Sequence, residues 1–227
     1  CQPIGFKNIN LFPHQLTLLS KCIELENKRM INSQIKHNIY FNVKTDFGVI
    51  CDKVGSGKSF VILGLILNNK YLKDAFIIPH TDYAPYDYRN NIQCYITNKN
   101  YLTVNLLFVP HTIFNQWKEY ISKNTSLNFY AIKTIRNFVK HPKFYEKFDL
   151  ILVNSSKHFQ MQELFHNYII SRVIYDEVDT IKITKCQKID SVFHWYVTSS
   201  VNNLLQPLGT WKIGYNPHGY AYNKYNY

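Results

Sequence analysis

The residues best suited to chemistry form a short glycine-rich segment that could hold phosphate groups. The segment Asp52–Ser59 reads Asp-Lys-Val-Gly-Ser-Gly-Lys-Ser and lies between a β-rich run, Phe47–Cys51, and an apolar helical pattern. Gly55 and Gly57 allow the tight turn that points backbone N–H groups at phosphate oxygens. A helix that begins near Lys58 would direct the positive end of its dipole at the same anion. This order of strand, glycine-rich turn and helix is typical of a P-loop, a phosphate-binding loop.

Three side chains of this loop have roles that follow from the chemistry of a nucleotide. Lys58 is predicted to contact the β- and γ-phosphates of ATP, and Ser59 to offer its hydroxyl to Mg²⁺. Ser56 lies between the two glycines and is expected to line the phosphate site with them. The general P-loop pattern has glycine where this chain has Asp52, so the match is incomplete. The alternative is a glycine-rich turn that carries a Lys-Ser pair by chance.

A second candidate group is acidic and follows an apolar run, Val173–Tyr175. Asp176 comes at the carboxyl end of this predicted strand, where an acidic residue can hold Mg²⁺ through its water shell beside a P-loop. Glu177 is placed to orient and deprotonate an attacking water. The alternative is a solvated loop after a strand. Lys58 and Asp176 are 118 residues apart, which leaves room for several strand-helix units between them.

Strands and helices alternate along the chain and must bring these two groups together. The predicted strands are apolar and rich in β-branched or aromatic residues, as strands buried on both faces are. They cover Phe47–Cys51, Val104–Val109, Asn128–Lys133, Leu150–Val153, Arg172–Tyr175 and Trp195–Thr198. The predicted helices cover Pro13–Lys28, Lys58–Asn68, Thr112–Lys123, Ile135–His141 and Ser156–Ile169. The alternation predicts an α/β fold, a parallel sheet with helices on both faces.

Two segments depart from this alternation. Residues from about 69 to 103 are mostly polar and aromatic, and we expect an insertion at one edge of the sheet. Residues 205–227 carry several glycines and prolines among many tyrosines, and we expect an irregular C-terminal extension there. Residues 1–204 would then form one domain.

A series of short motifs, taken in order, resembles those of the first RecA-like lobe of superfamily 2 helicases and translocases, especially the Snf2-like branch. The resemblance spans roughly residues 11 to 204. It explains Asp52, because the phosphate loop of that branch reads Asp-x-x-Gly-x-Gly-Lys-Thr. The motifs are Phe12–Gln15, Asp52–Ser59, Leu107–Pro110 with Gln116–Glu119, Phe148–Asn154, Asp176–Asp179, and Trp195–Ser200 with residues 202–204.

The resemblance implies a RecA-like P-loop NTPase lobe of a nucleic-acid-dependent ATPase that uses ATP and Mg²⁺. Gln15 would read adenine in such a lobe. Residues after two strand ends would contact the phosphates of DNA or RNA: Pro110, His111, Thr112, Asn154, Ser155 and Lys157. Residues that couple ATP to nucleic acid would be Asp179, Thr198, Ser199 and Ser200. The serines and threonine of the strand-end loops could instead act only as helix N-caps.

Two departures from the family pattern bear on activity. The motif that starts at Trp195 has Ser199 and Val201 where the family has glycine and proline. We also expect no second RecA-like lobe in this chain, and an isolated first lobe would hydrolyse ATP weakly because the transition-state arginine comes from the other lobe. The alternative function is a nucleotide-binding scaffolding subunit of a transcription or packaging complex with a decayed ATPase. The spacing of the motifs argues against a P-loop kinase of small substrates.

The composition indicates the setting in which this protein works. A net charge of +11 predicts a polyanionic partner, although 22 of the 26 basic residues are lysine and the chain has 24 asparagines, as AT-rich codons would give. Those codons suggest an AT-rich genome, such as that of a large DNA virus or a parasite, and the motif set together with this composition resembles the helicase-like ATPases of large DNA viruses. We therefore expect a role in viral transcription or genome handling, in the virion or the host cytoplasm, with other subunits as partners.

Cysteine usage and hydropathy bear on the compartment. Five cysteines without a Cys-x-x-Cys pair predict a reducing, intracellular setting rather than a disulfide scaffold. No stretch of the chain approaches 18 consecutive apolar residues, so we expect no membrane span.

Overall fold

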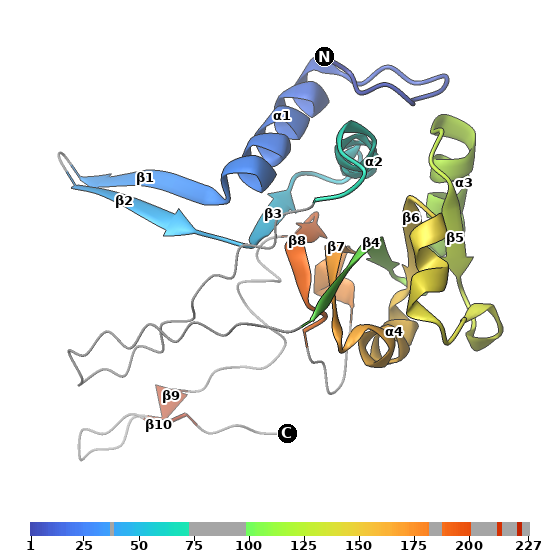
Figure 1. The fold of residues 1–227 in the computed structure, drawn as a ribbon. Coiled ribbons are helices and arrows are strands. Elements are labelled where there is room, and N and C mark those ends of the chain that lie inside the picture. The colour runs from blue at the N-terminus through green and yellow to red at the C-terminus, as the bar shows by residue number, and fades with distance from the viewer. Residues whose placement is uncertain (37–38, 73–98, 182–187, 201–212, 215–221, 224–227) are drawn as a thin grey trace.

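A six-stranded parallel β-sheet forms the centre of the molecule in the computed structural model (Figure 1). Its strand order is β3-β8-β7-β4-β6-β5, and every neighbouring pair is parallel. The strands are β3 (Phe47–Cys51), β4 (Asn100–Val109), β5 (Phe129–Ile132), β6 (Leu150–Asn154), β7 (Tyr168–Asp176) and β8 (Ser191–Thr198). The structure describes residues 1–36, 39–72, 99–181, 188–200, 213–214 and 222–223.

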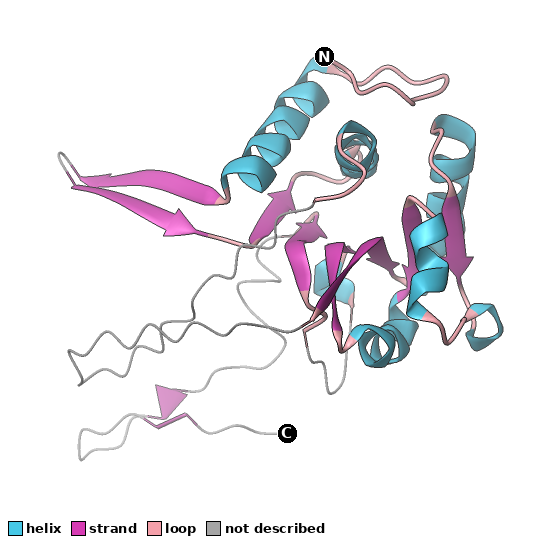
Figure 2. Cartoon of the chain, viewed as in Figure 1, coloured by secondary structure: helices cyan, strands magenta, loops and turns pink. Residues whose placement is uncertain are grey.

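Helices cover both faces of this sheet (Figure 2). One face packs against α1, α2 and α3, which contribute Leu19, Ile62 and Trp117 to its core. The other face packs against α4 and a 3₁₀ segment, η3, which contribute Met161 and Tyr145. The predicted parallel sheet with helices on both faces is therefore confirmed. The bounds are α1 (Pro13–Lys28), α2 (Lys58–Asn68), α3 (Phe114–Asn124), α4 (His158–Phe165) and η3 (Pro142–Lys147).

The central strands carry continuous apolar runs because neither of their faces meets water. All of β6 is buried, and so is β4 from Val104 to Val109. Each large side chain buried in this way contributes roughly 1.5–3 kcal/mol to folding. The edge strand β3 instead alternates, with Phe47 and Val49 half-exposed. Gly48 lies under the ring of Trp195, where an added Cβ would come within 2.3 Å of that ring.

A hairpin between α1 and β3 was not predicted from the sequence. Its strands, β1 (Met30–Lys36) and β2 (Ile39–Lys44), pair antiparallel and extend away from the central sheet (Figure 1). Both strands mix polar and apolar residues without the long apolar runs of the central strands. The sequence signal for a strand is weak there, and backbone pairing between the two segments makes the structure.

Two predicted helices differ clearly from the structure, and strands β7 and β8 each begin four residues earlier than predicted. The helix predicted at Ile135–His141 is wrong: only a 3₁₀ turn forms at Ile135–Asn137. The backbone N–H and C=O of Val139 bond to the Tyr145 hydroxyl, at 2.9 and 3.0 Å, instead of continuing a helix. The helix predicted at Ser156–Ile169 ends at Phe165, since Tyr168 and Ile169 pair with β4 instead.

The predicted insertion also starts and ends differently. Strand β4 begins at Asn100 rather than Val104, so residues 100–103 belong to the sheet. Leu72, at the start of the predicted insertion, is buried and donates its backbone N–H to Ser171 Oγ at 2.8 Å. Residues 73–98 lie outside the described residues, as do residues 201–204. Within the predicted C-terminal extension, the described residues form a short antiparallel pair, β9 (Ile213–Gly214) and β10 (Tyr222–Asn223).

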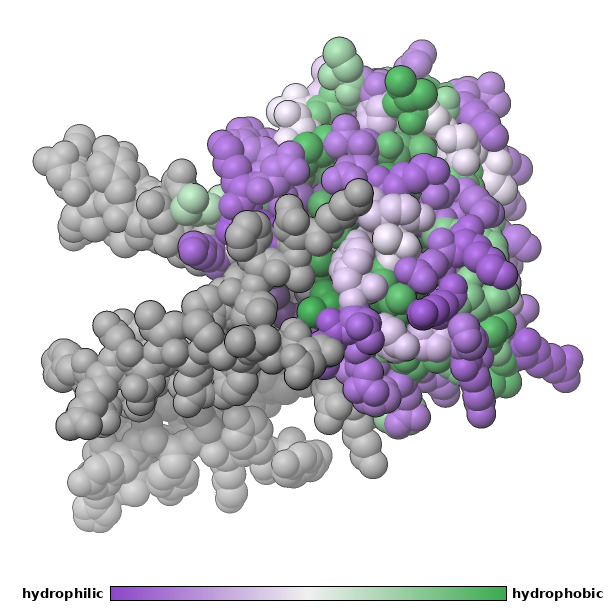
Figure 3. All heavy atoms as spheres, viewed as in Figure 1, coloured by the Kyte–Doolittle hydropathy of each residue, from purple (hydrophilic) through white to green (hydrophobic). Residues whose placement is uncertain are grey.

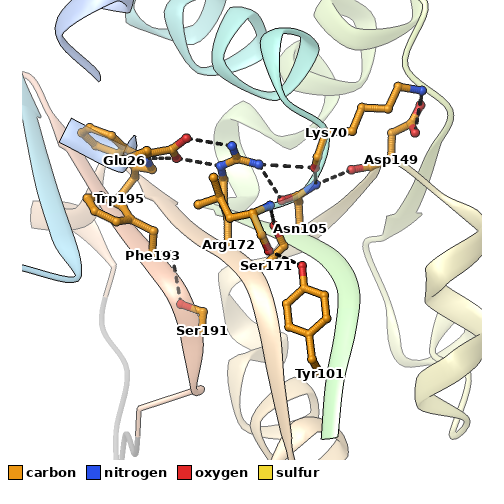
Figure 4. Close-up of polar contacts among 11 residues, drawn as sticks. Glu26, Lys70, Tyr101, Asn105, Asp149, Ser171, Arg172, Ser191, Phe193 and Trp195 are labelled. Atoms are coloured by element: carbon orange, nitrogen blue, oxygen red, sulfur yellow. Dashed lines mark hydrogen bonds and ion pairs between the residues drawn. The ribbon is translucent and has the colours of Figure 1, made fainter. Parts of the chain in front are cut away.

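A buried ion pair anchors the end of α1 on the sheet (Figure 4). Arg172 of β7 is fully buried and donates to both carboxylate oxygens of Glu26, at 2.6 and 2.7 Å. Glu26 also accepts the indole N–H of Trp195, on β8, at 2.8 Å. A third contact runs from Arg172 to Asn105 Oδ1 on β4, at 3.2 Å. Such bidentate and shared hydrogen bonds are what allow a charge pair to be buried.

The described surface mixes polar and apolar residues. On the face seen in Figure 3, hydrophilic residues predominate and hydrophobic ones form smaller areas between them. Among the described residues, no helix combines the length and the apolar character that crossing a membrane requires.

Candidate functional site

The strand order brings the predicted chemical groups to one edge of the sheet. In a parallel sheet all carboxyl ends lie at the same edge, which is where α/β proteins place ligands. Strand β3 leads into the phosphate loop (Asp52–Ser59), β7 ends at Asp176, and β8 ends at Thr198 between them in the strand order. Segments that are far apart in sequence therefore share one side of the molecule.

Two glycines give the phosphate loop its shape. Gly55 and Gly57 have φ angles of 82° and 83°, in the left-handed region that favours glycine. Gly57 immediately precedes the first residue of α2, and an added Cβ there would lie 1.9 Å from Gln15 Nε2. At Gly57 both the positive φ angle and the contact with Gln15 disfavour a side chain. At Gly55 an added Cβ would meet nothing within 4 Å, so only the positive φ angle disfavours a side chain.

Lys58 is the buried cation of this loop. Its side chain is only 8% exposed, and its Nζ donates to the backbone oxygens of Asp52 and Lys53 at 2.8 and 3.0 Å. No ion pair of Lys58 occurs among the described residues. It sits in the first turn of α2, whose N–H groups have no intrahelical acceptor. A buried ammonium beside such N–H groups suits a phosphate.

Asp52 takes the place of the first glycine of the general P-loop pattern. Its Oδ1 accepts the backbone N–H of Lys53 at 2.7 Å. This hydrogen bond is the main cause that lowers the pKa of Asp52 below its ordinary value. The Asp52 carboxylate therefore stabilises the first turn of the loop by binding its backbone, and the turn forms without a glycine at this position.

Gln15 links α1 to the phosphate loop. Its Nε2 donates to Ser56 O at 3.2 Å, and its Oε1 accepts the N–H of Phe12 at 2.8 Å. His14 Nε2 lies 3.2 Å from the same Ser56 oxygen. The first turn of α1 is thus bonded to the loop, and both polar atoms of the buried Gln15 amide have protein partners. The adenine-reading role of Gln15 stays a prediction.

Asp176 is buried at the end of β7 and has an unexpected partner. Its Oδ2 accepts the indole N–H of Trp117, on α3, at 2.7 Å. Burial raises the pKa of Asp176 to about 6, while the Trp117 hydrogen bond and the charge of Lys58 act in the opposite direction. Sequence analysis gave Trp117 no role beyond its place in the motif Gln116–Glu119. The only sequence signal for this contact was that a buried indole N–H needs a hydrogen-bond acceptor.

The residues after β7 and β8 are joined by hydrogen bonds. Thr198 Oγ1 donates to Asp179 Oδ1 at 2.6 Å, and Ser199 Oγ donates to Glu177 Oε2 at 3.3 Å. The backbone N–H of Ser200 donates to Thr198 Oγ1 at 2.9 Å. The structure therefore brings the predicted coupling residues together with the acidic segment.

Oxygen groups suited to Mg²⁺ come from two elements. Ser59, in the first turn of α2, offers a hydroxyl, and Asp176 offers a carboxylate. Both are the hard oxygen ligands that Mg²⁺ prefers beside phosphates. The two segments follow β3 and β7, which are both neighbours of β8 in the sheet. The groups present fit a magnesium nucleotide.

The predicted nucleic-acid loops, Pro110–Thr112 and residues 154–157, follow the neighbouring strands β4 and β6. His111 and Thr112 are exposed, whereas Asn154 is buried. Asn154 Nδ2 lies 3.0 Å from His111 Nδ1, so the two loops are in contact.

Capping of these loops differs from the serine and threonine capping considered above. Asn154 Oδ1 accepts the N–H of Ser156 at 3.2 Å and caps the turn formed by Ser155–Lys157. The turn that begins at His111 has no side-chain cap. Neither Thr112 nor Ser155 therefore acts as a cap here. The third residue of the second turn, Lys157, is half-buried.

Comparisons with known proteins bear on this arrangement. A model of the SNF2-related domain matches residues 14–200. A protein of Acanthamoeba polyphaga mimivirus named "Putative helicase R592" is 28% identical over 144 residues. That alignment covers 54% of this chain and 16% of the mimivirus protein, so the chain corresponds to a small part of that relative's length.

Proposed function

Since the chain belongs to the SNF2-related domain family, we propose that it is the ATP-binding lobe of a nucleic-acid-dependent ATPase, a helicase or double-strand translocase. The observation that carries this proposal is the buried Lys58 ammonium. It lies in a glycine-turned loop, at the sheet edge that also bears Asp176 and Glu177. A helicase-type ATPase needs these groups along one edge.

Each residue of the site has a defined task in ATP hydrolysis. Lys58 and the backbone N–H groups of Gly55–Gly57 bind the phosphates, and Gln15 contacts the adenine. Ser59 and Asp176 would hold Mg²⁺, which supplies positive charge against the phosphate oxygens. Glu177 orients the attacking water and accepts its proton. The contact of Ser199 with this carboxylate supports the orientation that the step needs.

The proposed setting is viral transcription or genome handling. The mimivirus relative and the lysine- and asparagine-rich composition support it. The partners would be DNA or RNA, held through backbone phosphates, and other subunits of a transcription or virion complex. The site of action would be the virion or the host cytoplasm.

The second candidate function is a nucleotide-binding scaffolding subunit with a decayed ATPase. The observation that favours it is the replacement of glycine and proline by Ser199 and Val201 in the motif after β8. The two candidates differ in turnover: the scaffold would bind ATP without hydrolysing it, even with nucleic acid and a second lobe present.

Nucleotide titrations test the shared part of both functions. Replacing Lys58 by alanine removes a buried ammonium from the phosphate site, so the Kd for Mg-ATP should rise by about 10- to 100-fold, as loss of a charge-assisted contact does. Lys53→Ala is the matched control, because Lys53 is exposed on the same loop and contributes only its backbone oxygen. Equal affinity for ATP in the wild type and Lys58→Ala would exclude this site.

A further inference from the structure

The bond between Trp117 and Asp176 joins two elements at the metal site. The indole N–H donates to Oδ2 at 2.7 Å across 59 residues of sequence. Trp117 lies on α3, and Asp176 ends β7. Both side chains are buried, at 1% and 4% exposed. This is a direct contact with the carboxylate that the proposed function assigns to Mg²⁺.

The direction of this N–H is set by packing. Trp117 belongs to the core on the α3 face of the sheet, with Phe114 and Ile121 of the same helix. Its ring also meets the ring of Tyr120 edge-on, with centroids 6.4 Å apart. A close-packed aromatic ring has little rotational freedom. An aspartate side chain has two torsions, and a hydrogen bond from a fixed donor restricts both.

We propose that Trp117 is a positioning residue for the metal site, which holds the Asp176 carboxylate in the orientation that serves the Mg²⁺ of a bound nucleotide. This inference rests on the proposed function, because it needs a site that binds Mg-ATP. Partners that orient metal ligands typically change metal affinity about 10- to 100-fold when they are removed. Trp117 would thus add to the strength of the metal site without touching nucleotide or metal.

The test is the Mg²⁺ dependence of nucleotide binding by Trp117→Phe, which keeps an aromatic ring and removes the N–H. A fluorescent N-methylanthraniloyl ATP is titrated with the whole chain in EDTA and in increasing MgCl₂. The Kd in EDTA should change less than about twofold, because the phosphate loop is intact. The apparent affinity for Mg²⁺ should fall about 10- to 100-fold.

Trp195→Phe is the matched control. Trp195 is also buried, and its indole N–H also donates to a carboxylate, Glu26 Oε1, at 2.8 Å. That carboxylate lies at the far end of α1 from Gln15. Loss of this bond should leave the Mg²⁺ dependence as in the wild type.

A second pair of variants separates orientation from packing. In an Asp176→Asn background, Trp117→Phe should cause no further loss of Mg²⁺ affinity, since the carboxylate it orients is gone. Equal Mg²⁺ dependence in the wild type and Trp117→Phe would overturn the inference, and so would a loss of nucleotide affinity that is the same with and without Mg²⁺. Failure of the wild type to bind the nucleotide at all would overturn the proposed function itself.

Discussion

Ser199 stands where the family resemblance has glycine, and the structure gives its hydroxyl a partner. It donates to Glu177 Oε2 at 3.3 Å, a bond that glycine could not make. The neighbouring Thr198 donates to Asp179 at 2.6 Å. The departure from the family pattern therefore adds a contact to the proposed base, which is compatible with an active site.

Glu177→Gln should separate binding from turnover. The amide keeps the shape of the side chain and can still accept the Ser199 bond, but it cannot take a proton from water. We expect the Kd for ATP to stay within about twofold and kcat to fall by about 100-fold or more, because the base acts in the transition state.

The measurement is ATP turnover by this chain, or by a longer protein that contains it, together with nucleotide binding. The control is Glu163→Gln, an exposed glutamate on α4. Parental turnover in Glu177→Gln would remove the catalytic role from this residue. No turnover with nucleic acid and a second lobe present, together with tight ATP binding, would favour the scaffolding subunit.

Sequence could predict the residues whose roles depend on their near neighbours. The phosphate loop is such a case, because Gly57 and Lys58 act within a few residues of each other. Trp117 and Asn154 could not be predicted in the same way. Their partners lie 59 and 43 residues away, and only the strand order β7-β4-β6 brings them close.

The elements with the strongest local signals were predicted with the bounds that the structure has. Helices α1 and α2 and strand β3 are in this group. Proline at the start of α1 and the apolar run of α2 mark these helices without help from the rest of the chain. The β1-β2 hairpin was missed because pairing between two weak strand segments forms it. The 3₁₀ turn at Ile135–Asn137 was missed because the Tyr145 hydroxyl binds the Val139 backbone after it.

Helix α1 connects the core to the phosphate loop. Its last turn is held by the Glu26–Arg172 pair, and its first turn bonds Ser56 through Gln15. The helix is 16 residues long, so it spans about 24 Å at 1.5 Å per residue. Because the Glu26–Arg172 pair lies far from Gln15 along this helix, we expect its loss to lower the free energy of unfolding.

Glu26→Gln should destabilise the fold strongly. It leaves the fully buried Arg172 charge without its counter-charge, which typically costs about 3–5 kcal/mol. The measurement is the free energy of unfolding from urea denaturation. The matched control on the same helix is Glu24→Gln, whose carboxylate pairs with Lys21 and Lys28 at the surface. That change should cost far less, because solvent screens an exposed ion pair. Similar losses for both variants would mean that the buried pair does not anchor α1.

At the scale of the whole molecule, the question is whether the charge of +11 is placed for a partner. Several lysines are already used in surface ion pairs, including Lys70 with Asp149 and Lys188 with Asp46. His111, Thr112 and Lys157 instead follow β4 and β6 at the sheet edge that carries the phosphate loop. Nucleic acid could be bound through its phosphates by a site at this edge, or by lysines spread over the whole surface, and the two alternatives make different predictions.

The two accounts separate when two double variants are compared. Lys157→Ala with His111→Ala changes the proposed nucleic-acid edge, whereas Lys7→Ala with Lys44→Ala removes two exposed lysines, of which Lys44 precedes β3 at the opposite edge. Affinity for a labelled duplex and a labelled single strand is measured by fluorescence anisotropy at two salt concentrations.

A site at the edge predicts at least about a tenfold loss of affinity for the first pair, with a salt slope smaller by about one. The second pair should lose little. A diffuse surface predicts an equal or larger loss for the control, because the control removes two lysines and the first pair removes one. Equal or larger losses in the control would therefore leave the strand-end loops without a role in holding nucleic acid.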